Sequence, residues 1–80
     1  MDIIVGSVVK SRAGHDKERF FITLGSDNGF ALIADGKERK LEKPKRKNIK
    51  HLAPTGSVYD LPETNKQLRK LLKDFSNQED

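Results

Sequence analysis

The fold is decided by the stretch Arg19-Phe-Phe-Ile-Thr-Leu-Gly-Ser-Asp-Asn-Gly-Phe-Ala-Leu-Ile-Ala-Asp-Gly36. Its first part, residues 19–24, is aromatic and β-branched, which is the composition of a β-strand. Asn28-Gly29 favours the tight turn of a hairpin, because both residues tolerate a positive φ. Residues 30–34 are apolar throughout and predict a strand that is central in a small barrel or buried on both faces. The stretch therefore predicts a hairpin at the centre of the protein.

The segment before this hairpin predicts one more strand. Residues 6–11 have Val8 and Val9 at their centre, and β-branched pairs of this kind favour a strand. Residues 12–17 then form a loop, in which Gly14 can take a positive φ. We expect this loop to connect the first two strands.

The segment after the hairpin is less regular. Asp35-Gly36 predicts a type I′ turn into a fourth strand at residues 39–42. Pro44 ends that strand because it has no N–H to donate to a ladder, and residues 45–47 follow as a loop. Residues 48–52 predict a short fifth strand, whose two apolar anchors lie three residues apart. That spacing also allows a bulge or a 3₁₀ turn.

Five short strands joined by tight turns predict a mainly β fold, in the form of a small closed or half-closed barrel. Residues 53–56, Ala-Pro-Thr-Gly, end the β section, so the barrel covers residues 1–56. Residues 57–80 form a linker and a C-terminal helix packed on the barrel, followed by a frayed polar tail at residues 76–80.

The helix is predicted over residues 65–75 from an apolar face with helical spacing. Thr64 and Gln67 fit a capping box at its start. The opposite face is basic. The helix can therefore lie on an anionic membrane, dock on another protein, or pack on the barrel and cover one open end. The last interpretation is favoured, because so small a barrel needs additional apolar area.

Composition limits the functions open to the chain. Eighty residues with 34% hydrophobic content form one small domain without room for a deep catalytic cleft. The absence of cysteine removes disulfides, thiolate metal sites and cysteine nucleophiles, and it fits a reducing compartment. The apolar run at residues 3–5 is too short for a signal peptide or a membrane span. We expect a cytoplasmic, non-enzymatic protein that needs no metal, cofactor, small-molecule substrate or membrane.

The positive charge is concentrated in one segment. Residues 37–50 carry eight basic and two acidic residues, a local charge of +6 on a chain whose total is +4. Segregated charge of this kind makes RNA the leading partner, with duplex DNA as an alternative. Residues 45–47 are expected to make the safest phosphate contacts. The candidate contacts in this segment are Lys37, Lys40, Lys43, Lys45, Arg46, Lys47 and Lys50.

A second, smaller basic group lies in and beside the loop at residues 12–17. Gly14 lets backbone N–H groups approach an anion, and Arg12 and Lys17 flank it. An ordinary polar turn is the alternative interpretation. The candidate contacts here are Arg12, Gly14, His15, Lys17 and Arg19.

Stacking of bases on aromatic side chains is not expected. Phe20, Phe21 and Phe30 lie in strands that need them for the core, and Tyr59 stands alone. We therefore expect recognition of the backbone and shape of folded RNA rather than of base edges.

Several segments together resemble the KOW motif, beginning with Gly6-Ser-Val-Val-Lys-Ser-Arg-Ala-Gly14-His-Asp-Lys17 and Arg19-Phe-Phe-Ile-Thr23. Leu32-Ile-Ala-Asp-Gly36, Leu41-Glu-Lys-Pro-Lys45 and Ile49-Lys-His-Leu52 extend the resemblance, which covers about residues 5–52. The chain resembles the small bacterial KOW-domain RNA-binding proteins, which are similar to large-subunit ribosomal proteins of archaea and eukaryotes. One departure is Glu18, where many KOW motifs have a second glycine.

This resemblance implies an SH3-like β-barrel that binds RNA, in particular structured ribosomal RNA of the large subunit. It also implies that the loop at residues 12–17 contacts the RNA. Ribosomal proteins are further expected partners. An adaptor that binds proteins of the ribosome or of the transcription machinery is the alternative, because a fold does not define its ligand.

Overall fold

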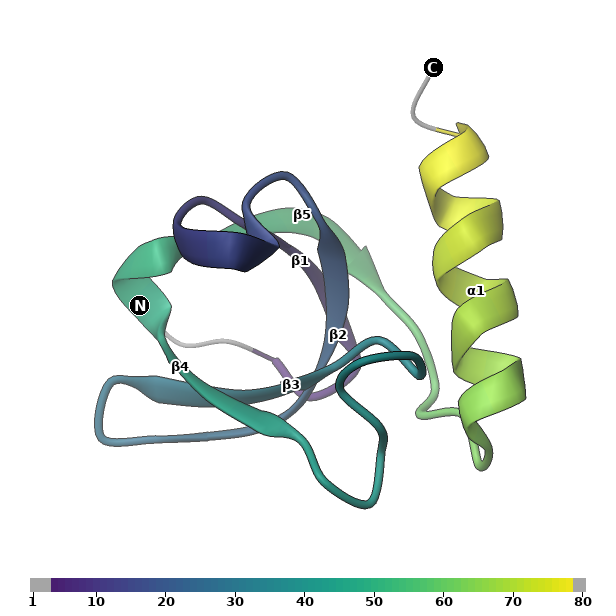
Figure 1. Ribbon diagram of the computed structural model, residues 1–80, viewed down its shortest axis with the longest axis horizontal. Coiled ribbons are helices and arrows are strands. Elements are labelled where there is room, and N and C mark those ends of the chain that lie inside the picture. The colour runs from purple at the N-terminus through teal and green to yellow at the C-terminus, as the bar shows by residue number, and fades with distance from the viewer. Residues whose placement is uncertain (1–3, 79–80) are drawn as a thin grey trace.

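The computed structural model describes residues 4–78. These residues form a five-stranded antiparallel sheet and one C-terminal helix, with two short 3₁₀ turns, η1 and η2, between strands (Figure 1). The elements are β1 (Ser7–Ser11), η1 (Gly14–Asp16), β2 (Phe20–Asp27), β3 (Phe30–Ala34), β4 (Lys45–Asn48), η2 (Ile49–His51), β5 (Leu52–Val58) and α1 (Asn65–Gln78).

The strands lie in the order β4-β3-β2-β1-β5, and the sheet curls into an open, barrel-like shape (Figure 1). β4 and β5 are its two edges, and η2 joins them directly. Register shifts beside Val8 and Leu24 interrupt two of the ladders, and bulges of this kind bend a strand and increase its twist. The predicted mainly β fold with a C-terminal helix is confirmed, as a curved sheet that is not closed.

The central hairpin forms as its composition predicts. Asn28 and Gly29 have φ values of 48° and 83°, and positive φ at both positions is the signature of a type I′ turn. Asp27 pairs with Phe30 directly before and after the turn. β3 has the predicted bounds, whereas β2 runs three residues beyond the predicted Leu24.

The predicted fourth strand at residues 39–42 is wrong. The Asp35 side chain accepts hydrogen bonds from the backbone N–H groups of Lys37 and Arg39, both at 2.9 Å. An aspartate that satisfies nearby backbone donors in this way competes with a strand ladder, so residues 35–44 form a loop. The fourth strand is instead β4, in the lysine-rich segment that was predicted to be a loop.

The fifth strand is also displaced along the chain. The Asn48 side chain accepts a hydrogen bond from the N–H of Lys50 at 2.9 Å and caps η2. β5 then contains Pro54 and Gly56, which were predicted to end the sheet. An edge strand tolerates proline, because its outer backbone groups need no ladder partner.

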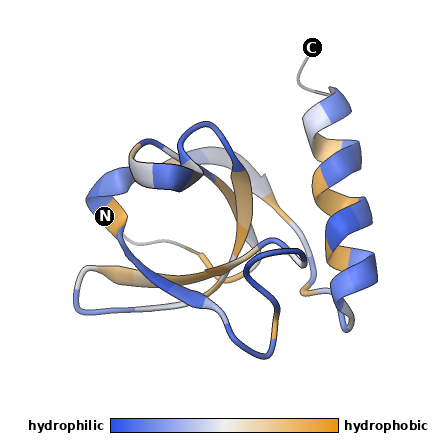
Figure 2. Ribbon diagram, in the orientation of Figure 1, coloured by the Kyte–Doolittle hydropathy of each residue, from blue (hydrophilic) through white to orange (hydrophobic). Residues whose placement is uncertain are grey.

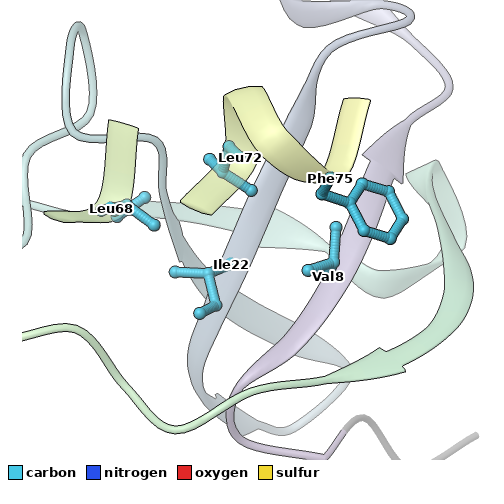
Figure 3. Packing of buried hydrophobic residues seen from close by; sticks show 6 residues of the cluster. Val8, Ile22, Leu68, Leu72 and Phe75 are labelled. Carbon is cyan, nitrogen blue, oxygen red and sulfur yellow. The ribbon is translucent and has the colours of Figure 1, made fainter. Parts of the chain in front are cut away.

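The sheet has one apolar cluster on each face, because neighbouring residues of a strand point to opposite sides. On the inner face, Val9 and Phe21 pack with apolar residues of β3 and β5. On the outer face, Val8 and Ile22 pack against α1 (Figure 3). Figure 2 shows the matching apolar colour along the strands and in a stripe of α1. The protein is therefore stabilised by two apolar clusters rather than by one central core.

The helix therefore covers the outer face of the sheet. The prediction that it covers an open end of the barrel is wrong. Leu68, Leu72 and Phe75 point toward β1 and β2 in Figure 3, and the rings of Phe75 and Phe20 form a T-shaped pair with a centroid distance of 5.2 Å. An apolar sheet face must be covered, and the apolar stripe of α1 covers this one.

The start of α1 matches the predicted capping box in part. Thr64 Oγ1 accepts a hydrogen bond from the N–H of Gln67 at 3.1 Å, as expected. Gln67 Oε1 accepts from the N–H of Glu63 at 2.9 Å, one residue before the predicted partner. The helix continues to Gln78, beyond the predicted end at residue 75, and residues 79–80 of the predicted tail lie outside the described residues.

Candidate nucleic-acid interface

The loop between β1 and β2 lies against η2 at one end of the curved sheet (Figure 1). The backbone N–H of Arg12 donates a hydrogen bond to the carbonyl of His51 at 2.8 Å. Lys47 Nζ donates to the carbonyl of Ala13 at 2.9 Å. These contacts bring residues 12–13 against residues 47–51, which lie more than thirty positions later in the sequence.

Five exposed side chains surround this junction and define what we call the barrel-end surface. They are Arg12, His15, Lys17, Lys50 and His51. Residues 12–17 and 45–51 together carry six basic residues and one acidic residue, a net charge of +5 on a chain whose total is +4. The two segments that meet here therefore carry more than the whole net charge of the chain, and the remainder of the chain sums to −1.

Lys47 is not an exposed contact, although the sequence suggested it. Its side chain is 8% exposed, and its ammonium group supports the loop through Ala13. Directly paired residues of an antiparallel ladder share a face, and Lys47 pairs with the inward-facing Ala31. Burial of an ammonium group is tolerated only with polar partners. Lys47 therefore holds the loop in place while other residues face solvent.

The loop conformation requires two residues with positive φ. Gly14 is exposed at φ 79°, as predicted. Glu18 has a φ of 73°, which a non-glycine residue adopts at a cost of about 1 kcal/mol. Its carboxylate pairs with Lys10 Nζ at 2.9 Å, and this hydrogen bond lowers the pKa of Glu18. Glu18 thus combines a left-handed backbone conformation with an ion pair to β1.

The other half of the basic segment lies elsewhere. Residues 35–44 form what we call the helix-side loop, which carries exposed Lys37, Lys40 and Lys43. Arg69 Nη1 donates to the carbonyl of Gly36 at 2.7 Å. A Cβ built on Gly36 would come within 2.6 Å of a carbonyl oxygen of α1. The glycine thus permits close docking of this loop on the helix.

The helix-side loop borders a groove of about 1130 Å³ beside α1. Five basic and four acidic residues line this groove. Arg19, a predicted contact, pairs there with Glu38 at 3.0 Å. The charges in the groove nearly cancel, so it lacks the concentrated positive charge of the barrel end.

The predicted contacts therefore do not form one surface. The structure brings Arg12, Gly14, His15 and Lys17 to the barrel end with Lys50. It places Arg19 and the lysines of the helix-side loop beside α1. Lys45 is half-buried on the inner face, and Arg46 is exposed on the outer face.

Sequence reasoning assigned no role to His51, whose carbonyl anchors the first loop. A backbone contact of this kind leaves no signal in the residue type. Phe30 was assigned to the core, but it belongs to neither apolar cluster. The uniformly apolar composition of β3 could not show which of its faces is covered.

The chain matches no protein-family model and no curated protein. Within residues 4–78, no three histidine, aspartate or glutamate side chains converge to hold a metal ion. No helix in that part of the chain has the length and apolar character needed to cross a membrane.

Proposed function

We propose that this protein is a non-enzymatic, cytoplasmic RNA-binding protein of the KOW type that binds structured ribosomal RNA. The observation that carries the proposal is the meeting of the first loop with η2, through the hydrogen bond between Arg12 N and His51 O at 2.8 Å. This contact fixes two basic segments in one orientation. Charges held on a rigid scaffold can match the phosphate spacing of a folded RNA, which supports recognition by backbone and shape.

The electrostatic distribution supports the same partner. Arg12, Lys17 and Lys50 are exposed and stand on short connections between strands. If each of these three side chains neutralises one phosphate, the logarithm of the affinity falls with the logarithm of salt concentration at a slope of about 2.7. Filter binding of the full chain to folded large-subunit ribosomal RNA at several salt concentrations measures this slope.

Competition with random duplex DNA and sedimentation with ribosomal subunits complete the test. We expect folded RNA to compete better than DNA, and we expect binding to persist on protein-free ribosomal RNA. Equal competition by DNA would contradict RNA recognition. Sedimentation with intact subunits but not with naked RNA would indicate a protein-interaction adaptor instead.

A further inference from the structure

A second surface lies on the outer face of β3 and β4, beyond the area that α1 covers. Leu32 is 41% exposed, so of the two alternatives predicted for β3, burial on both faces is wrong. The guanidinium carbon of Arg46 lies 3.9 Å from the centroid of the Phe30 ring. Arg46 pairs with Leu32 across the two strands. An exposed guanidinium group thus already lies over a half-buried aromatic ring.

A hollow of about 360 Å³ adjoins this stacked pair. Gly25 pairs with Leu32 across the neighbouring ladder, and a Cβ built on Gly25 would meet nothing within 4 Å. The missing side chain therefore contributes to the hollow. Asp27 pairs with Phe30 and also lines it. The hollow combines apolar walls, a guanidinium plane and one carboxylate.

We propose that this hollow binds one unpaired nucleobase, preferably guanine, of an RNA whose phosphates contact the barrel-end surface. The inference rests on the proposed RNA-binding function and deepens it. Aromatic rings and arginine planes are the usual stacking partners of splayed-out bases in RNA. The guanidinium group stays positively charged and adds attraction to the surrounding phosphates.

The carboxylate of Asp27 favours a base over a phosphate. An ionised aspartate only accepts hydrogen bonds, so it repels a phosphate oxygen and attracts N–H donors. Guanine presents neighbouring N–H groups on its Watson–Crick edge, which two carboxylate oxygens can accept together. Adenine presents one donor beside an acceptor on that edge and would fit less well.

The size of the hollow favours a base over a protein. Seven residues line it, whereas a stable protein interface takes about 20–30 residues on each side. The hollow is also linked to the barrel-end surface through the backbone. The N–H of Ile49 donates to the carbonyl of Gly29 at 2.9 Å, so the turn before Phe30 is tied to η2 and hence to Lys50. One RNA strand can therefore reach both places.

The experiment compares three RNA hairpins that differ only at one position. One is fully paired, one carries a single bulged guanine, and one a single bulged adenine. Fluorescence anisotropy with the full chain gives the affinity for each. We expect the bulged guanine to improve affinity by about tenfold over the paired hairpin, which is within the range measured for stacking of one base.

Two variants remove the stacking without changing the net charge. Phe30→Leu replaces the ring by an aliphatic side chain, and Arg46→Lys keeps the charge but loses the planar group. In both, the bulged and paired hairpins should bind equally well. Phe30 is no phosphate contact, so Phe30→Leu should bind the paired hairpin as the original protein does. Asp27→Asn should reduce the preference for guanine over adenine. Circular dichroism melts establish that each variant is folded.

The two proposals fail in different ways. If the original protein binds none of the hairpins, nor folded ribosomal RNA, then the proposed function is wrong. If it binds the paired hairpin but gains nothing from the bulge, only the nucleobase site is wrong. The site is also overturned if Phe30→Leu and Arg46→Lys both keep the full tenfold preference, which would leave this face to a protein partner.

Discussion

The barrel-end surface and the helix-side loop divide a basic segment that is continuous in the sequence. In the helix-side loop, Glu38 pairs with Arg19 at 3.0 Å, and Glu42 accepts a hydrogen bond from Asn65 at 2.7 Å. After Pro44, residues 45–51 contain no acidic residue, and this part extends to the barrel end. The comparison teaches that charge density along a chain does not define a binding surface. The packing of each half decides whether its charged side chains make contacts within the protein or are exposed to a partner.

Removing a side chain that packs α1 against the sheet should produce the largest loss of stability. Leu68 is fully buried in the outer cluster. We expect Leu68→Ala to lower the free energy of unfolding by about 3 kcal/mol, through lost burial and a residual cavity. Urea denaturation measures the loss. Leu61→Ala is the matched control, because Leu61 is 43% exposed, and an equal loss there would contradict the role of the outer cluster.

Two double variants with the same change in charge test the comparison directly. Lys17→Ala with Lys50→Ala removes two charges from the barrel-end surface. Lys37→Ala with Lys40→Ala removes two from the helix-side loop. For the first pair, we expect RNA affinity to fall about tenfold or more at low salt, and the salt slope to decrease by about 1.8.

The second pair should change the affinity and the salt slope by less than half as much, since those lysines lie away from the converging loops. Filter binding to the same folded RNA measures both pairs. Equal effects would show that total charge, rather than its placement, governs binding.

The attachment of the helix-side loop can be weakened without touching a charge. Asn65 Oδ1 accepts a hydrogen bond from the N–H of Leu41 at 2.8 Å, and Asn65 Nδ2 donates to Glu42. We expect Asn65→Ala to cost about 1 kcal/mol of stability and to leave RNA affinity unchanged. Asn77→Ala, an exposed position on the same helix, is the control for helix propensity. A large loss of RNA binding in Asn65→Ala would contradict the division into two regions.

The smallest expected effect is on the pH dependence of stability. The hydrogen bond from Asn65 lowers the pKa of Glu42 from its ordinary value of 4.5. A carboxyl group with a lowered folded pKa contributes stability above its unfolded pKa, and the contribution is lost as pH falls through the folded pKa. The melting temperature of the original protein should exceed that of Glu42→Gln near neutral pH. The difference should disappear in acid. A difference that is independent of pH would show that Glu42 does not act through its charge.

The parts of the fold that could be predicted are those with strong local patterns. β3 was predicted with its observed bounds, and α1 was predicted from the spacing of its apolar residues. β4 could not be predicted, because Lys45-Arg46-Lys47-Asn48 has no strand composition. It becomes a strand through its pairing with β3, in which Ile33 lies opposite Lys45.

The candidate site divides in the same way. The residue types of both basic groups were evident in the sequence, but their convergence depends on a backbone hydrogen bond between Arg12 and His51. Burial of Lys47 was equally invisible, because alternation in a strand cannot be applied to a segment that is taken for a loop. The exposed stack of Arg46 on Phe30 depends on how far α1 extends over the outer face.

By itself, the sequence determined the central hairpin, the capped helix and the amount of positive charge. These follow from turn chemistry, side-chain periodicity and composition, which act over a few neighbouring residues. Only the tertiary structure decided which face each lysine occupies and which loops meet. Those outcomes depend on ladder register and on which sheet face the helix covers, and both are set by contacts between residues far apart in the chain.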